Sequence, residues 1–546
     1  MSRPTRIPGA TWLVAAAAGL ICLLVYLKSL SCGFVNYDDP VYILNNPLLG
    51  RLDGAMLVDA FTRPYEGWWM PLTWISLAVD HRFWGVNPTG YHLTNIVLHA
   101  VNVVLVVLLA DRLCTAAGIG ETAVPDAGRS RGWLLLLAGL FWGMHPLRVE
   151  SVAWVTERKD VLNGIFTLGA LLLYLRYARI REERGGRAAL HAYLLSLVLF
   201  VLSLMAKSVS VVLPAMLLVA DWYPLGRLRT GNVRRMLLEK VPFLAVSVAM
   251  SMLTFYLAGQ SNYLVPYAYF PFGQRLVVSG NAIFAYCRLF LWPVGIVPYR
   301  MIPDPIPDYF TVTTAVALLF CCACVVAGRK RHWVGATWAA FLLPLLPVLA
   351  FFQNGDQAYA ARFTYLSAIA PSIAAAVIVV AARERWGNRG AVRYLLPGAV
   401  CALLAWHAVL TVRLIDVWKS PETFWTRVIE VDPEVIAYKE RGRVYHAEGE
   451  YDAAIRDFST AIDRVTGGFR DTVYNLYAFR GESYRAKGDY RAAVRDFTAA
   501  ISMLPDPTYY YHRGLALEAL GMAKEAAEDF ARAGDEQGPI VWIDRR

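Results

Sequence analysis

Long apolar runs alternate with short polar loops along the first three quarters of the chain. A helix needs about 20 mostly apolar residues to cross a bilayer, and twelve runs approach that length. They fall near residues 11–30, 91–110, 133–147, 161–178, 190–206, 209–223, 241–258, 276–295, 311–327, 333–352, 363–382 and 395–414. The pattern predicts an all-α fold in which residues 1–414 form a polytopic membrane domain.

Four strongly basic loops predict the orientation, because Lys and Arg near the ends of spans prefer the cytoplasm. They are "RYARIREERGGR" (176–187), "GRLRTGNVRR" (226–235), "GRKRH" (328–332) and "ARERWGNRGAVR" (382–393). With all four inside, the chain crosses an even number of times between residues 240 and 328, yet three apolar segments lie there. We expect segment 276–295 not to cross, since it is interrupted by Ser279, Gly280, Asn281 and Arg288. About eleven crossings follow, with the N-terminus inside and everything after residue 414 outside.

The start of the chain, "MSRPTR" followed by "TWLVAAAAGLICLLVYL", predicts an uncleaved first span with its basic tip in the cytoplasm. The apolar stretch is longer than the core of a typical signal peptide, and no A-x-A cleavage site follows it. No N-x-[ST] sequon occurs anywhere in the sequence. This absence favours a bacterial inner membrane over a secretory lumen.

After residue 414 the composition becomes mixed and a period appears. "GRVYHAEGEYDAAIRDFSTAI", "GESYRAKGDYRAAVRDFTAAI" and "GLALEALGMAKEAAEDFARAG" align without gaps, and Gly442, Gly481 and Gly514 recur 39 and 33 residues apart. A tetratricopeptide repeat has about 34 residues. We predict three such repeats over 435–546, joined to the membrane domain by a half-repeat over 415–434. Repeats of this kind bind peptides on a concave face, and pure scaffolding is the alternative.

The composition agrees with a membrane protein and narrows the chemistry. The chain is 57% hydrophobic and only 18% charged, against about 25% charged residues in soluble domains. The net charge of +10 lies mostly in the loops, so topology explains it better than nucleic acid does. The cysteines show no metal-ligand or disulfide spacing. No Walker A, GxGxxG or HExxH motif occurs, which argues against nucleotide-driven and metalloprotease chemistry.

Two adjacent carboxylates, Asp38 and Asp39, follow the first apolar run in "FVNYDDPVYILNNP". A solvated turn, or a helix N-cap helped by Pro40, would explain them structurally. At the height of the lipid headgroups, however, a carboxylate could act as a general base towards an acceptor hydroxyl. We favour this functional interpretation, with Asp39 slightly preferred over Asp38.

A second polar stretch, "FWGMHPLRVESVAWVTERKDVL" (141–162), forms a turn between two apolar runs. Charged residues so close to hydrocarbon are costly unless they line a hydrated site. We favour Glu150, which lies between apolar neighbours, and Arg158, which begins the next apolar run. Glu157 or Lys159 is expected to be a solvated cap.

Cations occur at two further outside positions. Lys207 joins two apolar runs with almost no loop between them, and either snorkelling or a phosphate partner accounts for it. Arg362 and Tyr365 open a span in "QNGDQAYAARFTYLS". Arg grips phosphate well, while an interfacial anchor is the structural alternative. External carboxylates beside external cations suit a lipid-linked anionic donor and an acceptor activated by a base.

These motifs, together with "NPTGYHLTNIVLHAVNVVLV", "MAKSVSVVLPAMLL" and the repeats, resemble the transmembrane and tetratricopeptide-repeat O-mannosyltransferases and their bacterial relatives. That family belongs to the GT-C glycosyltransferases, which use polyprenyl- or dolichyl-phosphate sugars. The resemblance covers nearly the whole chain. It implies an inverting transfer on the external face to a protein or glycan acceptor that the repeats would select.

The resemblance also implies roles for single residues. Asp38 or Asp39 would be the base, and Arg158, Lys207 and Arg362, with Tyr365 beside them, would stabilise the donor phosphate. His145 and Glu150 match an external loop that would position a substrate. Many relatives carry an acidic residue after the lysine, whereas Ser208 stands there in this chain.

Other functions and cofactors stay open at this level. A membrane scaffold for envelope biogenesis and a transporter or flippase of a lipid-linked saccharide are the alternatives. No cofactor besides the lipid-linked donor is required and no metal ligands are assigned, although the paired acids could hold a divalent cation.

Overall fold

The computed structural model describes residues 9–119, 127–183, 185–230, 233–261, 264–352, 357–387, 390–465 and 473–540. These residues are mainly helical and form no β-strand. They divide into two compact units, one of residues 1–296 and 308–419 and the other of residues 297–307 and 420–546. The basic tip at residues 1–6 lies outside the described residues.

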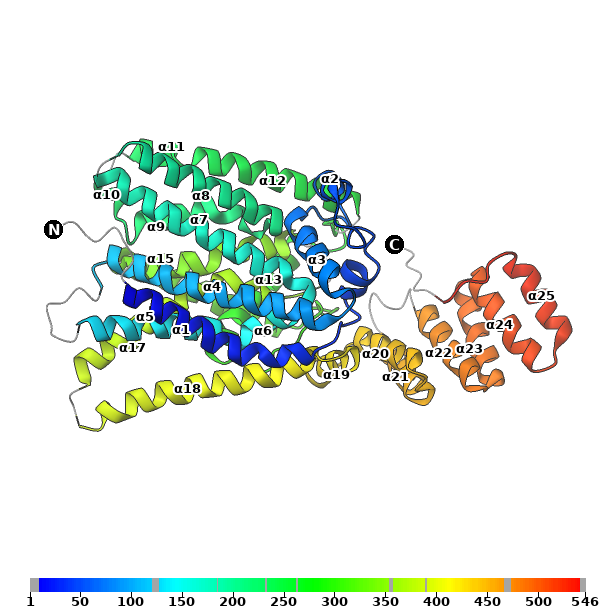
Figure 1. Cartoon of the computed structure of the whole chain (residues 1–546). Helices are drawn as coiled ribbons and strands as arrows, with labels where there is room; N and C mark the ends of the chain where they lie inside the picture. The colour runs from blue at the N-terminus through cyan, green and yellow to red at the C-terminus, as the bar shows by residue number, and fades with distance from the viewer. Residues whose placement is uncertain are drawn as a thin grey trace. The chain divides into compact units, whose positions relative to one another are not determined.

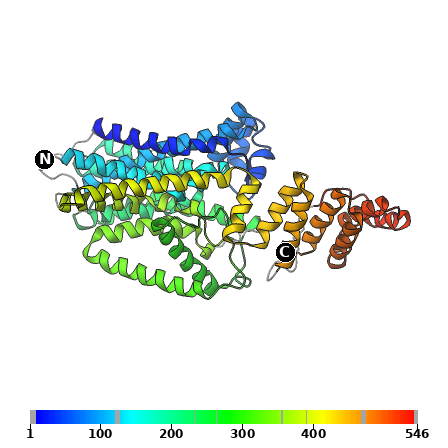
Figure 2. The same ribbon diagram turned by 90° about the horizontal axis from the view of Figure 1, so that it is seen from below.

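The first unit is a bundle of long helices with shorter helices at their ends (Figure 1). Its α-helices are α1 (Gly9–Tyr26), α2 (Gly54–Thr62), α3 (Pro71–Trp84), α4 (Pro88–Ala116), α5 (Ala127–Gly143), α6 (Val149–Ala153), α7 (Arg158–Glu183), α8 (Arg187–Ala206), α9 (Leu213–Trp222), α10 (Arg227–Thr230), α11 (Val233–Leu238), α12 (Val241–Gln260), α13 (Phe272–Leu291), α14 (Tyr309–Lys330), α15 (His332–Leu342), α16 (Thr364–Ser367), α17 (Ile369–Trp386) and α18 (Val392–Ile415). Helix α4 is central, because it packs against α1, α5 and α7. Figure 2 shows α1 and α18 running along the same bundle from below.

Every predicted apolar segment overlaps a helix. Among the described residues, seven stretches are long and apolar enough to span a membrane, or eight if a bent pair counts as one span. They are Gly9–Ser31, Pro88–Ala116, Val155–Glu183, Arg187–Ala206, Val233–Gln260, Tyr309–Lys330 and Val392–Trp418. The remaining predicted segments are shorter, bent or more polar. The prediction of an all-α membrane fold is therefore confirmed, and the number of eleven crossings stays a prediction.

Segment 276–295 falls on α13, which runs unbroken from Phe272 to Leu291 and is not among the seven candidate spans, so its failure to cross stays a prediction. Two of its interrupting residues contact α14: Gly280 lies against Thr314, and Thr313 donates a 2.8 Å hydrogen bond to Asn281. Irregular backbone occurs elsewhere, at the bent pair, where Ala361–Ser367 and Ile369–Trp386 meet at 62°. Non-helical backbone at membrane depth is tolerated only where it is buried in protein or lines a cavity.

The second unit is a row of paired helices. A single helix, α19 (Pro421–Val431), comes before three pairs: α20 (Val435–Ala447) with α21 (Tyr451–Asp463), α22 (Val473–Lys487) with α23 (Tyr490–Met503), and α24 (Pro507–Ala519) with α25 (Ala523–Ala533). Each pair closes where a glycine of the first helix meets a phenylalanine of the second, buried at Phe458 and Phe497 and half-buried at Phe530. A Cβ atom on Gly442 or Gly514 would lie within 2.9 Å of that ring, so only glycine allows this approach.

An arginine in the first helix of each pair binds an aspartate in the second with two hydrogen bonds of 2.7–2.9 Å. The pairs are Arg441–Asp457, Arg480–Asp496 and Arg513–Asp529. Each arginine also donates to a hydroxyl of the preceding helix, at Thr426, Ser459 and Thr498 respectively. We call this set the repeat ladder. Because α19 supplies Thr426, it occupies the position of the second helix of a preceding repeat.

Candidate active site

Four segments that are distant in sequence bring their charged side chains together in the first unit. They are the loop after α1, the turn from α6 into α7, the break between α8 and the next 3-10 helix, and the 3-10 turn Ala361–Phe363 before α16. Lys207 lies at the break in extended backbone, with φ −158° and ψ 131°. These breaks in helix geometry let charged side chains enter a region otherwise built of apolar helices.

Glu157 lies at the centre of this gathering. Its carboxylate is 3.2 Å from the Lys159 ammonium, 3.0 Å from that of Lys207 and 3.3 Å from Nε of Arg362. Only 1% of its side chain is exposed. The expectation that Glu157 or Lys159 is a solvated cap is therefore wrong, since Glu157 is buried and Lys159, with 12% of its side chain exposed, is paired with it. A charged residue so near hydrocarbon is stable only when it is paired.

Two further acids complete the pairing. Asp160 lies 2.6 Å from the Lys207 ammonium and accepts a 2.9 Å hydrogen bond from Ser151. Glu150 accepts from the backbone N–H of Arg362 at 3.0 Å and also from its guanidinium. We call the seven charged residues the ion cluster: Asp38, Glu150, Glu157, Lys159, Asp160, Lys207 and Arg362.

Asp38 is the member of the ion cluster with an open carboxylate. Its side chain is half-buried and makes no hydrogen bond or ion pair with any residue the structure describes. The charges of Lys159, Arg362 and Lys207 act on it, as does that of Glu157. Burial raises the pKa of Asp38, and the nearby cations oppose that shift. The Asp38 carboxylate therefore lies near these cations but forms no ion pair with any described residue.

Asp39 differs completely from its neighbour. Only 1% of it is exposed, and it accepts from the backbone N–H of Val35 at 2.8 Å, from the Trp154 indole at 2.9 Å and from the Thr156 hydroxyl. Although it precedes the helical turn that Pro40 begins, its side chain does not cap that turn. Burial raises its pKa to about 6, an effect to which the charge of Asp38 adds and which the three hydrogen bonds oppose. Asp39 fixes the loop to the turn before α7.

The indole ring of Trp154 contacts Asp39 and two cations of the ion cluster. Trp154 donates to Asp39, while Lys159 and Arg362 each lie 5.6 Å from the centre of its ring. Tyr37 packs 5.3 Å from Trp154. Cations over an indole are stabilised electrostatically. Trp154 therefore orients both cations, and sequence reasoning did not select it.

Besides Asp39, three predicted site residues lie outside the ion cluster. Arg158 is fully buried and donates to Asp80 at 2.6 Å, to the Tyr91 carbonyl and Ser76 at 2.8 Å, and to Asn95. The Tyr365 hydroxyl bonds His99 at 2.9 Å and Asn102 at 3.0 Å, in the helix core.

His145 accepts from the Leu147 N–H and contacts the Phe290 carbonyl at 3.0 Å. Burial lowers its pKa well below the usual value, and the nearby His407 and Arg148 add to the shift. Its two ring nitrogens are both used within the fold. The ion cluster thus gathers Asp38, Glu150, Lys207 and Arg362 from the predicted set, with Asp39 directly beside it.

An apolar cavity of about 530 Å³ begins one helical turn from the ion cluster. It includes Leu366, four residues after Arg362, and Thr167, which bonds Asn163; Asn163 in turn donates to the Lys207 carbonyl. From Ile369 its lining continues along α17 to Ala381, about 18 Å at 1.5 Å per residue. Helices α4, α7, α9 and α15 supply the other walls.

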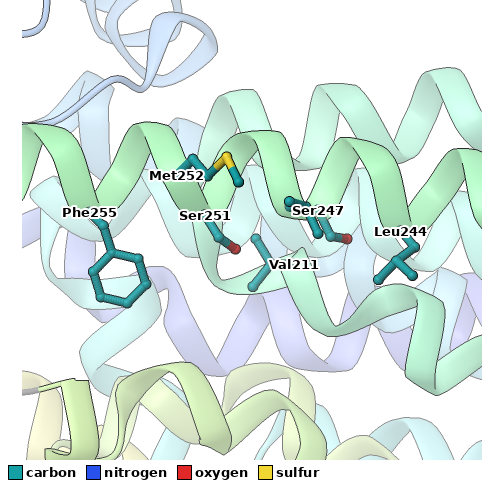
Figure 3. A pocket seen from close by; sticks show the side chains of 7 residues that line it. Val211, Leu244, Ser247, Ser251, Met252 and Phe255 are labelled. Carbon is teal, nitrogen blue, oxygen red and sulfur yellow. The ribbon is translucent and has the colours of Figure 1, made fainter.

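A second hollow, of about 550 Å³, lies on α12 and is open and shallow (Figure 3). It is lined by Val211, Leu244, Ser247, Val248, Ser251, Met252 and Phe255, and so contains no charged group. Among the described residues, no group of three or more His, Cys, Asp or Glu side chains is arranged to hold a metal ion.

The fold and the site together define a polytopic, all-helical membrane protein with an ion cluster and a helical-repeat unit. A family model for the tetratricopeptide repeat matches residues 480–539. Protein O-mannosyl-transferase TMTC4 of Homo sapiens is 23% identical over 495 residues, 80% of this chain and 64% of that protein. Tmtc3 of Drosophila melanogaster is 22% identical over 81% of this chain and 54% of its own length.

Tmtc1 of Drosophila melanogaster is 33% identical over 178 residues, 31% of this chain and 18% of that protein. The chain thus spans less than two thirds of the length of these relatives. It is similar to protein O-mannosyl-transferases of the TMTC group, which confirms the resemblance carried by its motifs.

Proposed function

We propose that this protein is a glycosyltransferase that moves a sugar from a polyprenyl phosphate to a hydroxyl group of a protein, on the external face of the membrane. The names of its relatives support protein mannosylation as the class of reaction. The observation that carries the proposal is the open carboxylate of Asp38 beside three cations. Asp39 carries no such role here, because all three of its hydrogen bonds hold the fold.

The phosphate of the donor binds to Lys159, Lys207 and Arg362 in this proposal. An ammonium group has three N–H donors; Lys207 uses two on Glu157 and Asp160, and Lys159 uses one on Glu157. Donors are therefore left for phosphate oxygens. Lys159 takes the place that the motifs suggested for Arg158, because four hydrogen bonds already occupy the Arg158 guanidinium.

The polyprenyl chain occupies the apolar cavity along α17. The cavity contains mainly aliphatic side chains and begins one turn beyond Arg362 and Lys207. A lipid phosphate needs this combination of a long apolar channel and cations at one end. Burying each methylene of the lipid contributes about 0.8 kcal/mol.

The reaction is a single displacement. Asp38 takes the proton of the acceptor hydroxyl as its oxygen forms a bond to the anomeric carbon. The bond from that carbon to the phosphate oxygen breaks, and its electron pair leaves with the polyprenyl phosphate. The cations stabilise the charge that develops on the leaving phosphate. One displacement inverts the anomeric configuration, so the linkage in the product is opposite to that in the donor.

The test is transfer of radiolabelled sugar by the purified full chain, using a panel of polyprenyl-phosphate sugars and a mixture of acceptor proteins. We expect label on protein with wild type and with Glu66→Gln, an exposed acid in the same loop region. Asp38→Asn is expected to transfer no label above background. Equal transfer by Asp38→Asn and wild type would exclude the proposed base, and retention of the donor configuration would exclude the single displacement.

A further inference from the structure

The segment that follows α25 does not continue outward but returns across the repeats (Figure 1). After Ala533 the chain leaves helical geometry, and residues 535–540 form no regular element apart from a turn. The contacts of this segment fall on α24 and then on α22, which are the first helices of their pairs. The second helices carry the aspartates of the repeat ladder instead.

Two contacts anchor the returning segment. Nε2 of His512, in α24, lies 3.0 Å from the Gly538 carbonyl oxygen, and Nδ1 of the same ring lies 3.0 Å from the Glu482 carboxylate. Both partners are acceptors, and each ring nitrogen of His512 faces one of them. His512 is buried, and Glu482 is itself held by Arg485 at 2.6 and 2.7 Å. The His512 ring that contacts the segment is thus held in position by other side chains of the repeats.

The second anchor is Ile540. It packs against two separate apolar clusters, one containing Leu476 and Phe479 and the other containing Tyr474 and Ala478. All four of these residues belong to α22, so Ile540 lies beside that helix. A branched side chain that joins two clusters of neighbouring repeats removes more apolar surface from water than an exposed tail would.

The spacing of the two anchors describes a short recognition pattern. The two anchor residues, Gly538 and Ile540, are separated by Pro539. Proline fixes its own φ near −65° and favours extended backbone in the residue before it. A carbonyl, a proline and a branched aliphatic side chain in sequence therefore fit this surface with little loss of conformational freedom.

We propose that the surface formed by α22 and α24 is a binding site for an extended polypeptide with this pattern, and that the chain's own segment Gly534–Ile540 occupies it. A polypeptide must displace the segment in order to bind. The further statement that such a polypeptide includes the acceptor of sugar transfer rests on the proposed function. Occupancy by the segment does not.

The tethered segment should weaken the binding of a free peptide by an amount that follows from its effective concentration. A segment tethered by a short flexible linker has an effective concentration in the millimolar range. If the free segment binds with a dissociation constant of about 0.1 mM, the tethered copy weakens binding of a free copy about tenfold.

The experiment measures fluorescence anisotropy of a labelled heptapeptide with the sequence of residues 534–540. Full-length Ile540→Asp opens the site without removing any residue, and a chain ending at Ala533 opens it by truncation. We expect both to bind the peptide at least tenfold more tightly than wild type does. Gln537→Asp, at an exposed position of the same segment, is the matched control and should behave like wild type. A peptide with Asp in place of Ile540 should not bind.

Adding His512→Phe to the Ile540→Asp chain should weaken peptide binding, since the ring is kept and the donor is lost. Far-ultraviolet circular dichroism checks that each variant keeps its helices. Equal peptide binding by wild type and Ile540→Asp, or no binding by a folded Ile540→Asp chain, would overturn the proposal. Because the readout is binding, failure of sugar transfer leaves this result unaffected.

Discussion

The ion cluster and the repeat ladder use the same kinds of side chain in opposite ways. In the ladder each Arg meets one Asp through two hydrogen bonds of 2.7–2.9 Å, and the same arrangement recurs three times. In the ion cluster four acids and three bases share contacts unequally, and the Asp38 carboxylate has no partner among the described residues. Closed pairs hold helices together, whereas an open carboxylate next to cations can exchange a proton with a substrate.

The largest expected effect comes from substituting the two adjacent aspartates one at a time. Asp38→Asn should lower the transfer rate by about 10²–10⁴, the usual contribution of a general base, while the thermal midpoint in detergent stays at or above that of wild type. Asp39→Asn should lower the thermal midpoint and leave the transfer rate nearly unchanged. Its new amide N–H₂ would face hydrogen-bond donors and leave one of those donors unpaired, at a cost of about 1–3 kcal/mol. Both are read from transfer assays and thermal unfolding. A loss of activity without a loss of stability in Asp39→Asn would reverse the two assignments.

The next effect compares two arginines of α7, Arg158 at the start of the helix and Arg179 near its end. Arg158→Met should destabilise the membrane unit by about 3–5 kcal/mol, because Asp80 would keep a buried charge without its cation. Arg179→Met, on the same helix and paired with Glu183 at the surface, should cost less than about 1 kcal/mol. Thermal unfolding of the two variants in detergent makes the comparison. Similar midpoints would show that the Arg158 contacts are weaker than their burial implies.

Sequence patterns predicted the helices and the repeats well, because both depend on residues close together in the chain. The ladder arginines even recur at one repeat position, directly before Gly442, Gly481 and Gly514. The same reasoning could not assign partners within "TERKDVL". Successive residues on a helix point about 100° apart, so Arg158 turns to Asp80 while Lys159 turns to Glu157.

The difference between Asp38 and Asp39 has the same origin. It depends on Trp154 and Thr156, more than a hundred residues away, and on the path of the intervening backbone. No local pattern contains that information. The local pattern could have indicated that these charged residues form ion pairs with one another, because so many charges close to apolar runs must be neutralised.

A smaller effect concerns pH. The folded-state pKa of Asp39, about 6, exceeds its ordinary value of 3.8. Its contribution to stability is therefore complete below pH 4 and is lost as the pH rises through 6, a change of roughly 3 kcal/mol at about 1.4 kcal/mol per pKa unit. Thermal midpoints of wild type and Asp39→Asn between pH 4 and 7 test this. We expect the wild-type midpoint to fall more steeply, and parallel curves would contradict the raised pKa.

The smallest effect is in the repeat ladder. Asp496→Asn should destabilise the repeat unit by about 1–3 kcal/mol, because the Arg480 guanidinium would lose its charged, two-point acceptor while partly buried. Transfer to a short peptide acceptor should stay unchanged, since no residue of the ladder belongs to the ion cluster.

The double variant Arg480→Met with Asp496→Leu supplies the control. Replacing both members of a buried pair by apolar groups is often close to neutral, so this variant should regain most of the lost stability, as judged by urea unfolding of the repeat helices. If the double variant is less stable than Asp496→Asn, the hydrogen bond from Arg480 to Ser459 contributes more than the ion pair. In that case the ladder holds consecutive repeats to one another rather than the two helices within each pair.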